Sequence, residues 1–321
     1  MSDAAENDPS PRKRLRDDAL QMGPRKKARI SDPLVHHGRH FGRTVHALCN
    51  VHILIVDGML RLGELANEPE ESFTYEQRRA FRVFRQLLNM IPELDDRLIN
   101  GGGEEAEGVA RHIQKGVSSA RSDDTKSLKG AILDWISPID EPLCPPIHRN
   151  QKFNCGFKHD VTGALLCPVQ LDWSDPQVKD ALSSGELAVP GDHWPVLLYA
   201  QCKFDPEDPW KGFLKNRILV LAYKHIFTSP SSVEKEVKAT RSGNARIHGM
   251  TKVTCPSIAY VATQARFALS SSSVFSRTDT VTDSERFYNS LLEFLEDNEE
   301  QQNVDELLVW WNRYVLLRIQ C

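Results

Sequence analysis

Apolar residues recur at helical spacing through most of this chain after residue 40, and this pattern limits it to a mainly α-helical fold. The clearest segment follows Thr74, which forms a capping box with Gln77 before apolar residues spaced three and four apart. From 41 to 66 the spacing favours another helix, although Asp57-Gly58 also permits a β-hairpin. We expect about ten helices in one compact domain over residues 39–321. The other predicted helices lie at 93–99, 104–120, 123–136, 174–183, 209–227, 231–243, 257–269, 286–295 and 304–319.

A long segment in the middle of the chain, residues 137–172, breaks the helical pattern. It holds Gly156, Gly163 and prolines at positions 138, 142, 145, 146 and 168, which predict irregular structure. A small β-hairpin through Thr162 and Gly163 would also fit this composition. A loop of this length is either functional or a boundary, so the domain could divide here.

The composition bears on the cellular compartment. No apolar run approaches the roughly 20 residues that a membrane-spanning helix needs, and the polar, acidic start contains no signal-peptide region. The seven cysteines are scattered without a C-x-x-C pair, which is typical of a reducing compartment rather than of a disulfide framework. We therefore expect an intracellular protein with no membrane partner.

Residues 1–38 form a polar, basic tail that we expect to be disordered. Its two basic clusters resemble a bipartite nuclear-import signal, which an import receptor would bind as an extended peptide. The alternative is a solvated arm that no receptor binds. Import is favoured, so we expect a nuclear protein. The signal residues are Arg12, Lys13, Arg14, Arg16, Arg25, Lys26, Lys27 and Arg29.

Three histidines, His36, His37 and His40, follow the tail at the start of the domain. Imidazole is a common metal ligand, so a metal site is conceivable here. We expect none, because the residues lie in a junction that we predict to be flexible.

A basic segment stands out within the mildly acidic body. Glycines beside its cations allow backbone N–H groups to be exposed, and arginine suits phosphate oxygens particularly well. The functional interpretation is a loop that contacts phosphate, DNA or RNA, and the alternative is a solvated helix face followed by a loop. Its candidate binding residues are Lys235, Lys238, Arg241, Asn244, Arg246, His248 and Lys252.

Four residues of the irregular segment could in principle bind zinc: Cys144, His148, Cys155 and His159. Zinc prefers four nitrogen or sulfur ligands in a tetrahedral arrangement. Two Cys-x3-His pairs are a less usual spacing than paired cysteines with paired histidines. We therefore expect no metal site and no cofactor.

A hydrolase acting on nucleic acid is a further alternative, which would use His159, Asp205 and Asp208 near the basic loop. This interpretation requires the three side chains to converge in one cleft. No motif of the sequence specifies a reaction, so the sequence favours a protein that is not an enzyme.

Several segments together resemble a domain-of-unknown-function family that is expanded in mushroom-forming basidiomycete fungi. The resemblance covers about residues 40–315 and implies one family domain and a fungal origin. It implies no activity and no catalytic residue. The segments that carry it are 156–159, 162–168, 205–212, 227–232, 239–250 and 275–287.

These observations favour a nuclear, non-enzymatic module that contacts nucleic acid or chromatin through the basic loop. The first alternative is a protein–protein interaction domain, in which the same loop meets an acidic partner. The nucleic-acid hydrolase is the second. The sequence does not indicate an oligomeric state.

Overall fold

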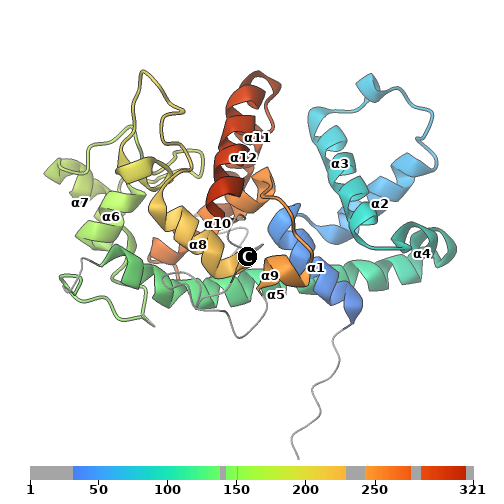
Figure 1. The fold of residues 1–321 in the computed structure, drawn as a ribbon, viewed down its shortest axis with the longest axis horizontal. Helices are drawn as coiled ribbons and strands as arrows, with labels where there is room; N and C mark the ends of the chain where they lie inside the picture. Colours follow the sequence, from blue (N-terminus) through green and yellow to red (C-terminus); the bar gives the residue numbers. More distant parts are fainter. Residues whose placement is uncertain (1–31, 138–141, 150, 229–242, 276–282, 316–321) are drawn as a thin grey trace, which may run out of the picture. The chain divides into compact units, whose positions relative to one another are not determined.

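The computed structural model describes residues 32–137, 142–149, 151–228, 243–275 and 283–315, and within them the chain forms helices and no β-strand (Figure 1). The predicted mainly α fold is confirmed. No helix among the described residues is long and apolar enough to cross a membrane. The α-helices are α1 Pro33–Thr44, α2 Val51–Leu62, α3 Tyr75–Met90, α4 Leu94–Asn100, α5 Gly102–Ile136, α6 Asp160–Leu166, α7 Pro176–Ser184, α8 Arg217–Phe227, α9 Asn244–Ile247, α10 Cys255–Leu269, α11 Ser284–Leu295 and α12 Gln301–Val315.

Local capping explains where several of these helices begin. Helix α3 starts behind the capping box that Thr74 and Gln77 form, as predicted from the sequence. Helix α10 has a second capping box, between Thr254 and Ser257. The predicted helix beginning at residue 231 lies outside the described residues.

The start of the domain differs from the prediction. Helix α1 begins at Pro33 behind an Asp32 cap, so residues 33–38, which the sequence analysis placed in the tail, are helical. The single helix expected from 41 to 66 is two helices, because the Asn50 side chain accepts hydrogen bonds from the backbone N–H groups of His52 and Ile53. These bonds start α2 in a new direction.

Helix α5 is one helix of 35 residues, where the sequence predicted two. The predicted break lay at Ser122, which was expected to cap a second helix beginning at Asp123. Asp123 and Asp124 carry the next two side chains. Both carboxylates instead pair with arginines of α1, Arg39 and Arg43. These ion pairs hold this stretch of α5 against α1, and the helix continues through Ser122.

The alternative of a β-hairpin through Thr162 and Gly163 is wrong, because both residues lie in α6. The His159 side chain caps this helix by accepting a hydrogen bond from the N–H of Val161. Gly163 is needed for packing rather than for a turn, since a Cβ atom there would overlap the ring of Trp173.

Helix α8 begins at Arg217, although the sequence predicted a start at Pro209. Asn216 fixes the later start, because its Oδ1 accepts from the N–H of Ile218 while its Nδ2 donates to the carbonyl of Tyr199. Gly212 and Leu214 both have positive φ angles and are therefore not helical.

Two apolar clusters form the core, and α5 contributes to both. The first half of α5, with Ile113 and Val117, packs in a cluster with α1, α2, α3 and α4. Its second half, with Leu128 and Ile132, packs in a larger cluster with α8, α10, α11 and α12. Asp32–Cys321 forms one compact unit. The two clusters therefore meet along α5, and not at residues 137–172, where the sequence suggested a division.

Candidate nucleic-acid interface

The predicted basic segment is only partly described by the structure. Lys235, Lys238 and Arg241 lie outside the described residues. The remaining part, residues 243–252, contains the short helix α9 and packs beside α1 (Figure 1).

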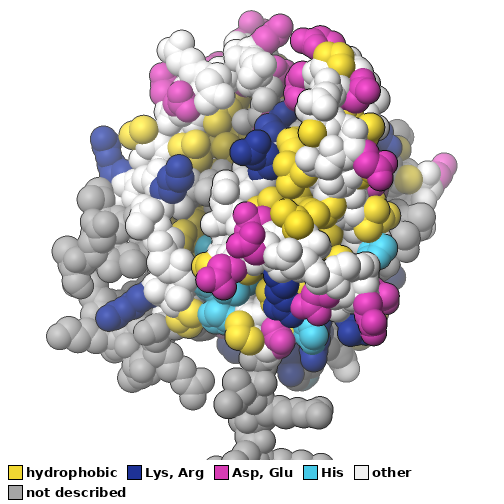
Figure 2. Space-filling model, turned by 90° about the vertical axis from the view of Figure 1, so that its right-hand side faces the viewer, with side chains coloured by type: hydrophobic (Ala, Val, Ile, Leu, Met, Phe, Trp, Pro, Cys, Tyr) yellow, Lys and Arg dark blue, Asp and Glu magenta, His cyan; other side chains and the backbone are white. Residues whose placement is uncertain are grey.

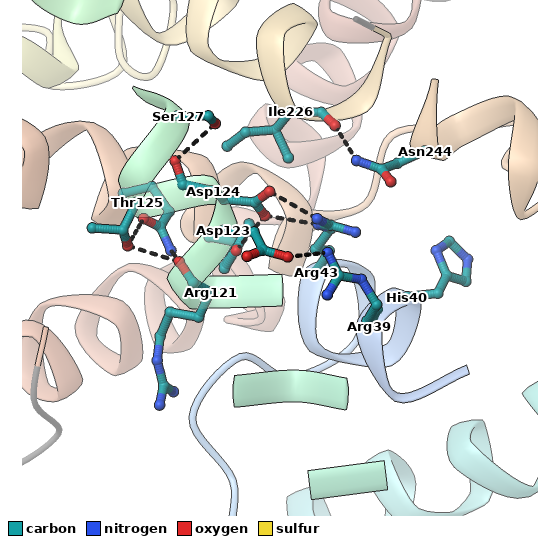
Figure 3. Close-up of polar contacts among 12 residues, drawn as sticks. Arg39, His40, Arg43, Arg121, Asp123, Asp124, Thr125, Ser127, Ile226 and Asn244 are labelled. Carbon is teal, nitrogen blue, oxygen red and sulfur yellow. Dashed lines mark hydrogen bonds and ion pairs between the residues drawn. The ribbon is translucent and has the colours of Figure 1, made fainter. Parts of the chain in front are cut away.

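Asn244 attaches this segment to the domain. Its Nδ2 donates a hydrogen bond to the carbonyl oxygen of Ile226 in α8 (Figure 3). The next residue, Ala245, is buried in the larger apolar cluster. Asn244, which the sequence suggested as a phosphate ligand, therefore has a structural role that fixes the position of α9.

Arg246 and Lys252 are the two fixed cations of the described segment, and both are exposed. Neither forms an ion pair with another described residue, unlike most arginines near them. Among the described residues, both charged groups therefore lie at the surface without an acidic partner.

His248 lies against α1, where its ring stacks on those of His36 and His40. The ring centroids are 4.3 Å apart in both pairs, and the planes of His40 and His248 differ by 5°. His36 and His40 share one face of α1 because residues four apart are neighbours on a helix. His36 and His40 were expected in a flexible junction but lie in a helix. The stack could not be predicted, because nothing in the sequence brings residue 248 to residue 40.

Beneath the histidine stack, a buried ion pair joins α1 to α5 (Figure 3). Arg43 donates from Nε to Oδ2 of Asp124 and from Nη2 to Oδ1, both at 2.7 Å. The hydroxyl of Tyr260 in α10 donates to the same carboxylate at 2.6 Å. At the surface, Arg39 pairs with Asp123 at 2.8 Å. Three helices are thus held together by one buried carboxylate.

Two histidines of the stack, His40 and His248, have lowered pKa values and are neutral at pH 7. Burial, followed by the charge of Arg43, lowers the pKa of His40 to about 4. Burial and the neighbouring His40 lower the pKa of His248 to about 3. His40 and His248 therefore offer uncharged N–H donors and acceptors, and their parallel imidazole rings can pack closely because neither ring is positively charged.

This arrangement predicts a loss of stability in mild acid. Between pH 6.5 and about 4 the unfolded chain binds protons that the folded rings exclude. The free energy of unfolding should therefore have its full value above pH 6.5. It should fall as the pH drops below 6.5. Because both rings are partly exposed, we expect a loss of about 1 kcal/mol between pH 7 and 5.

Urea unfolding at pH 7, 6 and 5 would measure this loss. The double variant His40→Gln, His248→Gln should show a flatter dependence on pH than the natural protein. His52→Gln, an exposed position on α2, is the matched control and should leave the dependence unchanged. An identical pH dependence in all three proteins would show that the stack does not exclude protons.

The four residues considered as zinc ligands do not form a cluster. Both ring nitrogens of His159 contact the backbone, Nε2 at the carbonyl of Pro145 and Nδ1 at the N–H of Val161. Cys155 is buried, whereas Cys144 is exposed. In the described part of the chain, no three His, Cys, Asp or Glu side chains are grouped as metal ligands.

Two of the three residues of the hydrolase alternative, His159 and Asp205, have structural contacts as well. His159 is the cap of α6, as described above. Asp205 pairs with Lys211 at 2.9 Å, and this ion pair lowers the pKa of the carboxyl group. A catalytic carboxylate would instead need a free oxygen near the reacting atoms.

A different part of the surface carries exposed apolar side chains. On α2, Ile53, Val56 and Leu60 are 54%, 49% and 41% exposed, and they share one face of the helix. Figure 2, which faces this side of the molecule, shows hydrophobic side chains gathered between acidic ones. Sequence periodicity predicted an amphipathic helix here but not that one apolar face would remain uncovered.

The comparisons with known proteins bear on the family alone. No significant match was found among curated proteins or among solved structures. The model of a family of unknown function, DUF6698, matches residues 115–316, from the middle of α5 to the end of α12. This range includes α9 and His248, whereas α1 precedes it. The chain belongs to the DUF6698 family.

Proposed function

We propose that this protein is a nuclear, non-enzymatic module that binds nucleic acid through the surface made by α1 and residues 243–252. The observation that supports it is the junction of two distant basic parts of the chain at the histidine stack. His36, Arg39 and His40 come from α1, while Arg246 and His248 come from the segment beside it.

The chemistry of this surface suits a phosphate backbone. Arg246 presents a planar, permanently charged donor group that can contact two phosphate oxygens at once. The neutral histidines can donate hydrogen bonds without requiring a counter-ion. Arg43 is paired with Asp124 and only 2% exposed, so it supports the surface and does not touch the ligand.

Nuclear localisation is part of this proposal and depends on the tail. Its basic clusters would bind an import receptor, and they add positive charge that could bind nucleic acid without the domain. A test of the domain therefore compares the full chain with a truncated protein that begins at Asp32, just before α1.

Fluorescence anisotropy with labelled duplex DNA and single-stranded RNA, across a salt series, tests the interface. Replacing Arg246 and Lys252 with glutamate should weaken binding by about tenfold or more at low salt. The slope of log affinity against log salt should become shallower by about 2, since about one unit is lost for each phosphate contact removed.

The matched control replaces Lys158 and Arg313, two exposed cations elsewhere, with glutamate. It changes the net charge equally, so it separates a local site from general attraction. Equal weakening by both double variants would mean that only the overall charge matters. No binding by the protein that begins at Asp32 would defeat the proposal for the domain.

A protein–protein interaction domain is the second candidate, and the apolar face of α2 favours it. Soluble monomers rarely leave a contiguous apolar face exposed unless a partner covers it. If the second candidate is correct, the truncated protein should bind neither DNA nor RNA in the anisotropy experiment. The proposed nucleic-acid interface lies on α1 and residues 243–252, whereas the apolar face lies on α2. Mutations can therefore test the two functions separately.

A further inference from the structure

A pocket of about 670 Å³ opens beside α6, away from the candidate nucleic-acid interface. Its apolar lining comes from separate parts of the chain and includes Val161 and Leu165 of α6 and Ile218 of α8. The two residues of α6 are partly buried, where they pack at the edge of the larger apolar cluster. This volume and lining are typical of sites for small organic molecules.

One wall of the pocket is the indole of Trp173, which is held in a fixed position. The ring lies directly on Gly163, where any side chain would overlap it. Its Nε1 donates to Oδ1 of Asp160 at 3.1 Å. A fixed aromatic ring beside an apolar floor gives the pocket a defined shape without a ligand.

The two thiols in the lining add apolar surface rather than reactivity. Burial raises the pKa of Cys167 to about 11 and also raises that of Cys202. Thiols are weak nucleophiles when protonated. The pocket is therefore suited to binding and not to covalent chemistry at sulfur.

Two ionised carboxylates stand at the rim. Asp160 accepts from Lys179 and Trp173, and Asp172 accepts from the N–H and hydroxyl of Ser174. These contacts lower the pKa of both carboxyl groups, so both are charged at pH 7. In each case the bonds are made by Oδ1, which leaves Oδ2 for a ligand.

One cation, the ammonium group of Lys179, already lies at this rim. It lies 2.6 Å from Oδ1 of Asp160 and 5.2 Å from the ring of Trp173. Aromatic faces attract ammonium groups in proteins, and a carboxylate supplies the opposite charge. Asp172, on the other hand, has no cationic partner among the described residues.

We propose that this pocket binds a small organic ammonium compound. Its apolar part would lie against Val161, Leu165 and Ile218, and its cationic group would meet Asp172 at the rim. This site is independent of the proposed nucleic-acid interface, because the two share no residue.

The test is isothermal titration calorimetry of the full chain with hexyltrimethylammonium, and with hexanoate as the anion of equal chain length. We expect the cation to bind and hexanoate to bind at least tenfold more weakly. Asp172→Asn should weaken binding of the cation about three- to tenfold, because it removes one partly exposed charge. Ala164→Trp should abolish it by filling the pocket, whose lining includes Ala164.

Asp134→Asn is the matched control, since Asp134 is an exposed carboxylate that pairs with Arg149 outside the pocket. It should leave binding of the cation unchanged. Thermal unfolding of every variant separates loss of binding from loss of fold. Equal affinity for cation and anion, equal effects of Asp172→Asn and Asp134→Asn, or no binding of the cation at millimolar concentration would each overturn the proposal.

Discussion

Replacing Asp124 with alanine should lower the free energy of unfolding by about 3–5 kcal/mol. This carboxylate accepts two hydrogen bonds from Arg43 and one from Tyr260, and both partners are buried. Without it, the guanidinium of Arg43 stays charged inside the protein with no counter-ion. The cost of an unpaired buried charge exceeds the net stabilisation that the pair itself provides.

Arg43 makes this position especially sensitive. Its Nη1 is buried and has no hydrogen-bond partner in the structure, so the guanidinium depends on Asp124 for its compensation. The charge of Arg43 also acts on His40 and His248, whose pKa values it lowers. Loss of Asp124 should therefore disturb the histidine stack as well as the joint of α1 with α5.

Urea unfolding of the full chain at pH 7 measures the effect. Asp123→Ala is the matched control, because Asp123 is the neighbouring carboxylate and its pair with Arg39 is largely exposed. It should cost less than about 1 kcal/mol. Tyr260→Phe removes only one hydrogen bond to Asp124 and should cost about 1–2 kcal/mol. Similar effects of Asp124→Ala and Asp123→Ala would show that breaking the buried Arg43–Asp124 pair costs no more than breaking the exposed Arg39–Asp123 pair.

Replacing Gly116 with alanine should destabilise the protein by about 2–4 kcal/mol, through overpacking of a helix contact. Here α5 crosses α1 with backbone against backbone, and a Cβ atom at Gly116 would overlap the carbonyl oxygen of Val35. Gly38 of α1 is equally confined, by the backbone of Ile113. Backbone atoms cannot move aside as a flexible side chain can, so the two helices would have to separate.

The same helix provides matched controls for Gly116→Ala. Cβ atoms added at Gly108 and Gly130 would have no neighbour nearer than 4.0 Å. Alanine at either position should stabilise the protein by about 0.5–1 kcal/mol, because alanine has the better helix propensity. Thermal unfolding would compare the three variants. A neutral Gly116→Ala, or one that behaves like the controls, would contradict the close crossing of α1 and α5.

Local signals in the sequence were sufficient for much of the fold. The capping box at Thr74 and Gln77 marks the start of α3 correctly, and the short helix at 93–99 corresponds to α4. Apolar spacing also located α10, α11 and α12 within a few residues. In these segments the capping interactions join residues close in sequence, and the spacing of apolar residues marks the buried face. Both can therefore be predicted from neighbouring residues.

Predictions failed where a distant partner determined the conformation. Ser122 suggested the cap of a new helix at Asp123, yet Asp123 and Asp124 pair with arginines of α1 and α5 continues past them. Gly163 looks like a turn residue, but Trp173 requires a glycine there within a helix. In each case the residue type favoured a helix start or a turn. A contact with a distant part of the chain determined a different conformation.

The candidate sites show the same division. The sequence by itself determined that the chain is mainly helical and that positive charge concentrates in residues 235–252, since periodicity and charge are local properties. Only the tertiary structure decided that His248 stacks on α1, that Asn244 is structural, and that two free carboxylate oxygens border an apolar pocket. These features join residues far apart in the chain, and their positions depend on how helices pack rather than on what their neighbours in sequence prefer.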